Sequence, residues 1–243
     1  MRTANPALNA NTFIGLRGTG SDVMTINGTV NKTSLLLMIV VFAAGYTWNL
    51  TVRGQNPQAW MMGGAIGGFV LALVTCLKKP WAPVTAPMYA VAEGLFLGAL
   101  SAIFESKFPG IVLSAVGLTF GTLFSLLLAY RTGLIRATEN FKLGVFAATG
   151  AIALLYLVTF ILGLFSIQIP YIHGSGMIGI GFSAFVVVVA AMNLVLDFDF
   201  IEQGSQNGAP KYMEWFGAFG LMVTLIWLYI EILRLLVKLR DRR

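Results

Sequence analysis

Long apolar stretches alternate with short polar connections along almost the whole chain. A helix needs about 17–25 apolar residues to cross the hydrocarbon core of a bilayer. Seven stretches approach or exceed that length, and the helices expected from them are Ser34–Val52, Ala59–Leu77, Met88–Phe104, Ile111–Tyr130, Leu143–Phe165, Met177–Leu196 and Trp215–Leu236. Because the connections are short and carry Gly and Pro, consecutive helices should be antiparallel neighbours. The pattern predicts an all-α polytopic membrane protein with a single seven-helix bundle.

The composition supports a lipid environment. Hydrophobic residues make up 57% of the chain and charged residues 11%, whereas soluble domains have roughly 45–50% and 25%. The net charge of +6 comes from Lys and Arg placed between the apolar stretches and at the C-terminus. That is the pattern of membrane anchors and not of a basic face for nucleic acid. We therefore expect contact with a lipid bilayer and none with nucleic acid.

The ends of the chain differ from its middle. Residues 1–32 are rich in Asn, Thr and Gly, and we expect a poorly ordered tail retained in the mature protein. Residues 33–237 form the expected transmembrane domain, and residues 238–243 a basic tail. Seven crossings with the N-terminus inside would leave the basic C-terminus outside, against the usual bias. Either the other loops override that bias, or a late segment near Gly204–Pro210 enters the membrane and returns.

Small residues recur four positions apart in three of the expected helices. Such spacing lets helix backbones approach closely in lipid, and we expect tight packing, although glycine-lined faces also border pores. The pairs are Gly63 with Gly67, Gly64 with Gly68, Gly94 with Gly98, and Gly117 with Gly121.

Ionisable residues in the apolar stretches are the candidates for function, because each is costly in a bilayer. In the sixth stretch, Asn193 and Asp197 share one helix face and form the expected inward pair, whereas Asp199 points roughly the opposite way. Asp199 and Glu202 are interpreted as solvated acids at the end of the helix.

The third and seventh stretches add further candidates. Thr224 and Glu231 lie on nearly the same stripe of the seventh helix, and Arg234 follows three residues later. A Glu231–Arg234 pair could be purely structural or functional, and the spacing does not decide between them. Glu93 is expected to face the bundle interior beside Gly94 and Gly98.

Buried acids give a chemical basis for a proton-sensitive cation pathway. Burial and a neighbouring acid both favour the neutral carboxyl group, so an acid pair can switch its charge near neutral pH. When ionised, such a site attracts hard cations such as calcium through its oxygen ligands, for instance at Asp197. Spacing alone does not identify the ion, and the metal stays unknown.

An enzymatic function has little support in the sequence. The single histidine, His173, lies in a loop, and Gly181-Phe182-Ser183 is only a fragment of a nucleophile elbow. No metal-ligand cluster, phosphate-binding loop or dinucleotide motif is present in the sequence, so we expect a protein that is not an enzyme and has no cofactor.

Three motifs together resemble the Bax inhibitor-1 family, the transmembrane Bax inhibitor motif proteins, and in particular its bacterial branch. They are Ala92-Glu93-Gly94-Leu95-Phe96-Leu97-Gly98, then Asn193-Leu194-Val195-Leu196-Asp197-Phe198-Asp199-Phe200-Ile201, and Leu228-Tyr229-Ile230-Glu231-Ile232-Leu233-Arg234-Leu235-Leu236. The resemblance implies six helices around a central C-terminal helix, and a pair of acids that senses pH for a calcium leak. Asp197 matches the first acid, but Thr224 stands at the position of the second. Glu231 is our candidate substitute.

Three functions remain open. The first is a pH-sensitive cation leak, with calcium as the expected ion. In this function Asp197 is the gate, Glu231 is its partner and Glu93 lines the route. The supporting residues are Asn193, Asp199, Thr224 and Arg234. The second is a non-conducting partner that modulates a membrane-bound AAA protease, as the bacterial relatives suggest, in a bacterial inner (plasma) membrane. Proton-coupled solute transport ranks third, because the interrupted half-helices of such transporters are not seen in the sequence.

Overall fold

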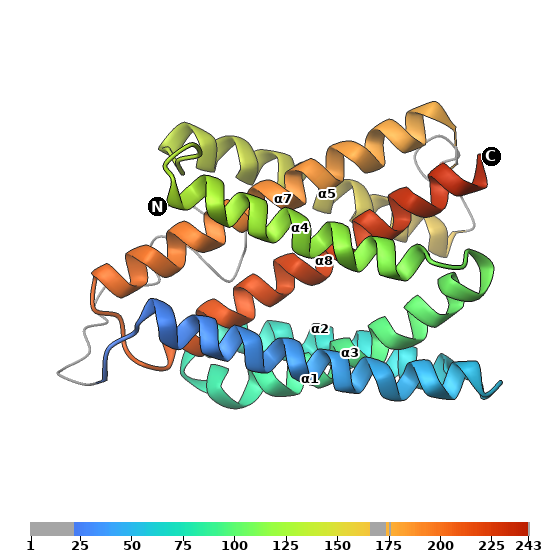
Figure 1. The fold of residues 1–243 in the computed structure, drawn as a ribbon, viewed down its shortest axis with the longest axis horizontal. Helices are drawn as coiled ribbons and strands as arrows, with labels where there is room; N and C mark the ends of the chain where they lie inside the picture. Colours follow the sequence, from blue (N-terminus) through green and yellow to red (C-terminus); the bar gives the residue numbers. More distant parts are fainter. Residues whose placement is uncertain (1–21, 166–173, 175, 243) are drawn as a thin grey trace. The chain divides into compact units, whose positions relative to one another are not determined.

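The fold is all-helical in the part of the chain that the structure describes. A computed structural model describes residues 22–165, 174 and 176–242. It contains seven long helices, drawn as coiled ribbons in Figure 1, and one short 3₁₀ turn, η3 (Lys79–Trp81). The helices are α1 (Ile26–Val52), α2 (Gln58–Leu77), α3 (Ala82–Lys107), α4 (Ile111–Arg131), α5 (Glu139–Leu164), α7 (Met177–Gln206) and α8 (Met213–Asp241).

All seven helices are long and apolar enough to cross a membrane. They contain between 20 and 30 residues, or about 30–45 Å at 1.5 Å per residue, which matches or exceeds a hydrocarbon core of about 30 Å. The predicted fold class is therefore confirmed. The most apolar window of α8 is 56% buried, against at most 44% in any other helix.

The helices extend further into polar sequence than the apolar stretches indicated. The first helix begins at Ile26 and not at Ser34, because the Thr25 side chain accepts a hydrogen bond from the Gly28 amide and caps it. At the other end α8 continues to Asp241, so residues 238–241 belong to a helix and not to a tail. An apolar window detects only the part of a helix at hydrocarbon depth, which is why both ends were missed. Residues 1–21 of the expected tail lie outside the described residues.

The connection between α7 and α8 is a short turn. Helix α7 runs unbroken to Gln206, and Gly208 then adopts a positive φ of 64°. That backbone conformation suits glycine. Since α8 is also one unbroken helix, the alternative of a segment that enters and returns near residues 204–210 is not seen.

The described residues divide into two compact units, with the division falling inside α7 and α8. The α1–α3 unit comprises residues 22–109 and 199–223, and the α4–α5 unit comprises residues 110–198 and 224–242. Each unit is described by itself.

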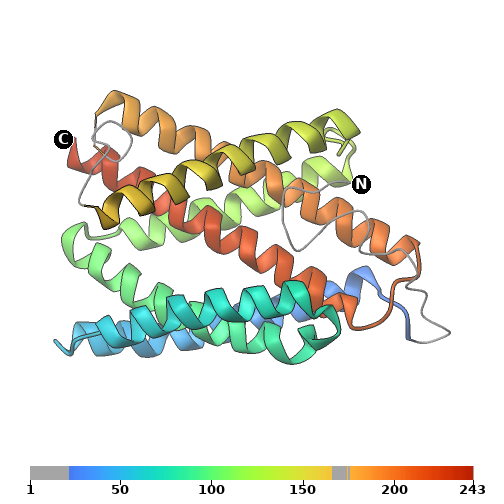
Figure 2. The ribbon, with the colours of Figure 1, turned by 180° about the vertical axis from the view of Figure 1, so that it is seen from behind.

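In the α1–α3 unit, α3 packs against both α1 and α2 (Figure 2). Glycine permits these contacts: Gly94 faces Val40 and Ala43 of α1, and Gly64 of α2 faces the α3 backbone at Ala92 and Phe96. The Gly94–Gly98 and Gly64–Gly68 pairs thus act in packing as predicted. A Cβ atom at Gly117 or Gly121 would meet nothing within 4 Å, and in the Gly63–Gly67 pair only Gly67 faces a neighbour, the Ala92 side chain at 3.8 Å.

In the α4–α5 unit, α5, α7 and α8 share an apolar core. Ile152 of α5 packs with Val186 and Val189 of α7, and Trp227 of α8 lies against them. The Tyr130 and Phe198 rings are in contact, with centroids 5.9 Å apart. This core positions the polar side chains of α5, α7 and α8.

Candidate functional site

The polar pair expected on α7 is fully inside the protein. Asp197 is 0% exposed and Asn193 is 2% exposed. The Asn193 amide donates to the hydroxyl oxygen of Thr149 on α5 and to the Val189 carbonyl, both at 2.9 Å. The bond to Thr149 links α7 to α5 one helical turn before Asp197, whereas the bond to Val189 lies within α7.

The two acids after Asp197 are more exposed. Asp199 accepts a hydrogen bond from Gln203 at 2.6 Å, and Glu202 accepts one from Gln206 at 3.3 Å. Each partner is one helical turn further along α7. Both acids are partly exposed, which agrees with their interpretation as acids at a helix end.

A three-residue polar cluster links α8 to α5. Glu231 is 1% exposed, and its Oε1 atom accepts hydrogen bonds from the Tyr156 hydroxyl and from Arg234, each at 3.0 Å. Arg234 also donates to the Tyr156 hydroxyl oxygen at 2.9 Å. The predicted Glu231–Arg234 pair therefore forms, with Tyr156 as a third member that the sequence did not indicate, because one tyrosine in an apolar helix carries no spacing signal.

The second carboxylate oxygen of Glu231 is less well satisfied. Its Oε2 atom is buried and has no hydrogen-bond partner of standard geometry in the described part of the chain, although the Trp227 side chain faces the carboxylate. Thr224, two turns earlier on α8, is also buried, at 3% exposed. Asp197, Thr224 and Glu231 all belong to the α4–α5 unit.

Lys238 is a further polar residue that sequence reasoning misplaced. It was expected in a basic tail, yet it is only 6% exposed. Its ammonium group donates to the Gly179 carbonyl at 3.1 Å and to the Ser183 hydroxyl at 2.9 Å. Ser183 is thus a hydrogen-bond partner that links α7 to α8. The single histidine, His173, lies outside the described residues.

Glu93 belongs to the α1–α3 unit, whereas Asp197 and Glu231 belong to the α4–α5 unit. It is half-buried, and its carboxylate lies against Gly68 of α2, where a Cβ atom would leave it no room. Glu93 therefore faces α2, whereas Gly94 and Gly98, beside which it was expected to lie, face α1.

A second buried glutamate, Glu214, anchors the start of α8 and had no role assigned from the sequence. It is 0% exposed and accepts hydrogen bonds from the Thr25 amide and hydroxyl at 2.9 and 2.8 Å. Lys32 forms an ion pair with it, and Lys211 lies 3.1 Å away. The chain beside Thr25 is held to the same turn, since the Met24 amide donates to the Ala209 carbonyl at 2.6 Å. The Glu214 cluster, Glu214 with Thr25, Lys32 and Lys211, ties α1 to α8.

Among the described residues, no group of three or more His, Cys, Asp or Glu side chains is placed to hold a metal ion. Calcium normally takes six to eight oxygen ligands.

One comparison with known proteins identifies the chain. The family described as Bax inhibitor 1 like matches residues 5–241. No curated protein and no solved structure matches. The match covers nearly the whole chain and includes both units and all seven helices, so this membrane-spanning protein belongs to the Bax inhibitor 1 like family.

Proposed function

We propose that the protein is a pH-sensitive leak pathway for cations, calcium first among them, in a bacterial inner membrane. The observation that carries the proposal is the complete burial of the Asp197 carboxyl group in a membrane-spanning helix. A buried acid in such a helix is costly and is most often retained for an ion or proton path.

The proposed gate is the charge of Asp197. The ionised carboxylate attracts a hard cation in a low-dielectric surrounding, whereas the protonated group does not. The hydrogen bond from Asn193 to Thr149 of α5 holds this part of α7 in a fixed orientation. Flux should therefore increase with pH as Asp197 loses its proton.

Glu231 is the proposed partner of that gate, in place of the acid replaced by Thr224. Its carboxylate is paired with Arg234. Tyr156 donates a hydrogen bond to it, and the positive charge of Lys238 attracts it. Protonation of Glu231 would release Arg234, whose side chain is 41% exposed and can reach the membrane interface. Glu93 is proposed to line the route.

The cluster of Glu231, Arg234 and Tyr156 also favours a second candidate function. In this function the protein does not conduct ions but is a membrane partner that modulates a membrane-bound AAA protease. Glu231 is held by Arg234 and Tyr156, and Thr224 cannot ionise, so the acid pair that the family resemblance implies is incomplete. The N-terminal tail is the proposed handle for the protease. Deleting residues 1–21 spares Thr25 and Lys32 of the Glu214 cluster, so a loss of association with the protease would be due to the tail itself.

The test is calcium-indicator flux into proteoliposomes across a series from mildly acidic to mildly alkaline pH. The parent protein is compared with Asp197→Asn and with Glu202→Gln, a matched loss of one carboxylate on the same helix. Flux that increases with pH in the parent and in Glu202→Gln, but is independent of pH in Asp197→Asn, would support the gate. No flux in any of the three proteins would reject conduction and favour the partner function.

A further inference from the structure

A groove runs between α2 and α3 in the α1–α3 unit. Its volume is about 560 Å³, and it extends from Trp60 and Leu95 at one end to Leu71 and Met88 at the other. All of its lining residues are apolar side chains or glycine. A volume of this size lies within the range of about 300–1,000 Å³ typical of small-molecule sites.

Two neighbouring glycines form the groove in different ways. At Gly64 a Cβ atom would lie 2.8 Å from the Phe96 amide nitrogen, so this glycine brings the two backbones together. At Gly63 a Cβ atom would meet nothing within 4 Å. Gly63 therefore leaves the space open, and a larger side chain there would fill the groove without disturbing the packing of α2 on α3.

The groove faces lipid and has the length of one leaflet. Trp60, Met88 and Val91 are all exposed, by 43%, 52% and 44%. Trp60 and Leu71 are eleven residues apart on α2, or about 16 Å along its axis, which is about half of a 30 Å hydrocarbon core. An apolar groove of that length and volume fits one acyl chain.

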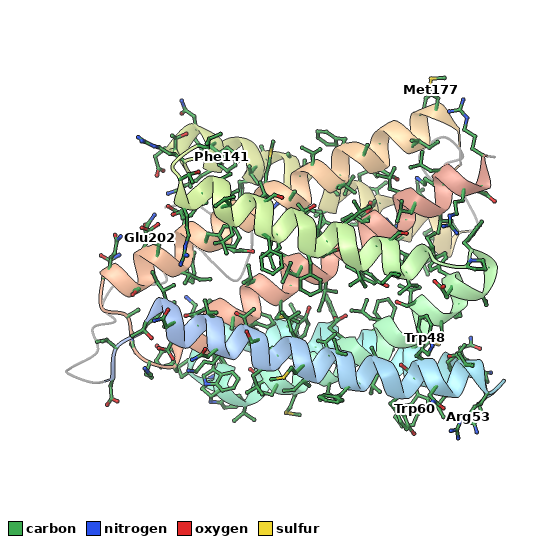
Figure 3. The ribbon with its side chains drawn as sticks, viewed as in Figure 1. Trp48, Arg53, Trp60, Phe141, Met177 and Glu202 are labelled. Atoms are coloured by element: carbon green, nitrogen blue, oxygen red, sulfur yellow. The ribbon has the colours of Figure 1, made fainter. Side chains whose placement is uncertain are left out.

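The mouth of the groove has the features of a membrane interface. The Trp60 and Tyr46 rings meet edge to face, with centroids 5.5 Å apart, and aromatic residues concentrate at this depth. Figure 3 shows Trp48, Trp60 and Arg53 at the same end of the α1–α2 hairpin. Arg53 is exposed, and a guanidinium group binds phosphate oxygens in a bidentate manner.

We propose that the α2–α3 groove is a phospholipid site, with one acyl chain in the groove and the lipid phosphate at Arg53. The apolar lining fits the chain, the aromatic pair marks the headgroup level, and the charge of Arg53 complements the phosphate. A second copy of this protein would instead place a helix in the groove.

The test is native mass spectrometry of the protein released from vesicles of phosphatidylglycerol and phosphatidylcholine. The parent should retain a bound phospholipid, and Gly63→Leu should weaken that retention at least tenfold. Gly150→Leu is the matched control, because Gly150 on α5 also has open space in front of it, and its retention should stay within twofold. Arg53→Gln should reduce the preference for the anionic lipid.

Two results would overturn the proposal. One is retention in Gly63→Leu equal to that of the parent, with both variants unfolding at the parent's temperature. The other is a parent that carries no lipid but forms a dimer that Gly63→Leu dissociates, which would assign the groove to a second copy.

Discussion

Two buried glutamates on α8 have nearly the same exposure but different surroundings. Glu214 in the α1–α3 unit receives hydrogen bonds from the Thr25 amide and hydroxyl and is paired with Lys32 and Lys211. Glu231 in the α4–α5 unit uses one oxygen for both Tyr156 and Arg234. Its other oxygen is buried with no hydrogen-bond partner of standard geometry among the described residues.

This difference in partners indicates that the charge of Glu214 is structural, whereas that of Glu231 can change with protonation. Removing the charge of Glu214 would leave two ammonium groups without their carboxylate, so its ionised form is strongly favoured by its neighbours. Glu231 has one direct cationic partner, Arg234, whose side chain is 41% exposed and long enough to reach toward the membrane interface. Two glutamates of equal burial on one helix can therefore differ in role, and their partners show the difference.

The largest expected effect is that of Glu214→Gln. Breaking a buried ion pair by removing one partner costs about 3–5 kcal/mol, because the other charge is left uncompensated. We expect a loss at the lower end, about 3 kcal/mol, since Lys32 and Lys211 retain some exposure. The measurement is the free energy of unfolding in mixed micelles, with Glu202→Gln as the control. Equal stability of the two variants would contradict the structural role.

Glu231→Gln should have a smaller effect on stability. The amide still accepts a hydrogen bond from Tyr156, and Arg234 can move toward the headgroups, so the expected loss is about 1–2 kcal/mol. The same unfolding measurement applies. A loss as large as that of Glu214→Gln would show that Glu231 is a structural charge too.

Tyr156→Phe tests the third member of the cluster formed by Glu231, Arg234 and Tyr156. It removes a hydroxyl that donates to Glu231 and accepts from Arg234, and a single buried hydrogen-bonding group contributes about 1 kcal/mol. Phe160→Leu, a lipid-exposed change on the same helix, is the control. No difference between the two variants would remove Tyr156 from the cluster.

The smallest expected effect is that of Lys211→Gln. The Lys211 side chain is 48% exposed, and an ion pair at such a position contributes about 0–1 kcal/mol after solvent screening. Lys32→Gln should cost more, because the Lys32 side chain is only 20% exposed. If the order of the two variants is reversed in the unfolding measurement, the burial argument fails.

The sequence predicted the fold better than the site. Long apolar stretches identify helices such as α4 within a residue or two, because the bilayer imposes their length. The helix face of Asn193 and Asp197 follows from a period of 3.6 residues, and the Glu231–Arg234 pair from a spacing of three. Each of these signals lies within one helix.

Contacts between helices could not be predicted in this way. The partners Tyr156 for Glu231, Ser183 for Lys238, and Thr25 for Glu214 come from other helices or from the residues that cap them. They depend on helix rotation and on close approach at glycines such as Gly94, which are set by packing.

The central claim is that Asp197 changes its protonation state while Glu214 does not. The most direct test is infrared difference spectroscopy of the reconstituted protein during a pH titration, with Asp197→Asn and Glu231→Gln used to assign the carboxyl bands. We predict a protonated carboxyl band that disappears as the pH rises, that is absent from Asp197→Asn, and that changes over the same pH range as calcium flux. A difference spectrum in which Asp197→Asn loses no titrating carboxyl band of the parent, or no titrating carboxyl band at all, would contradict the claim.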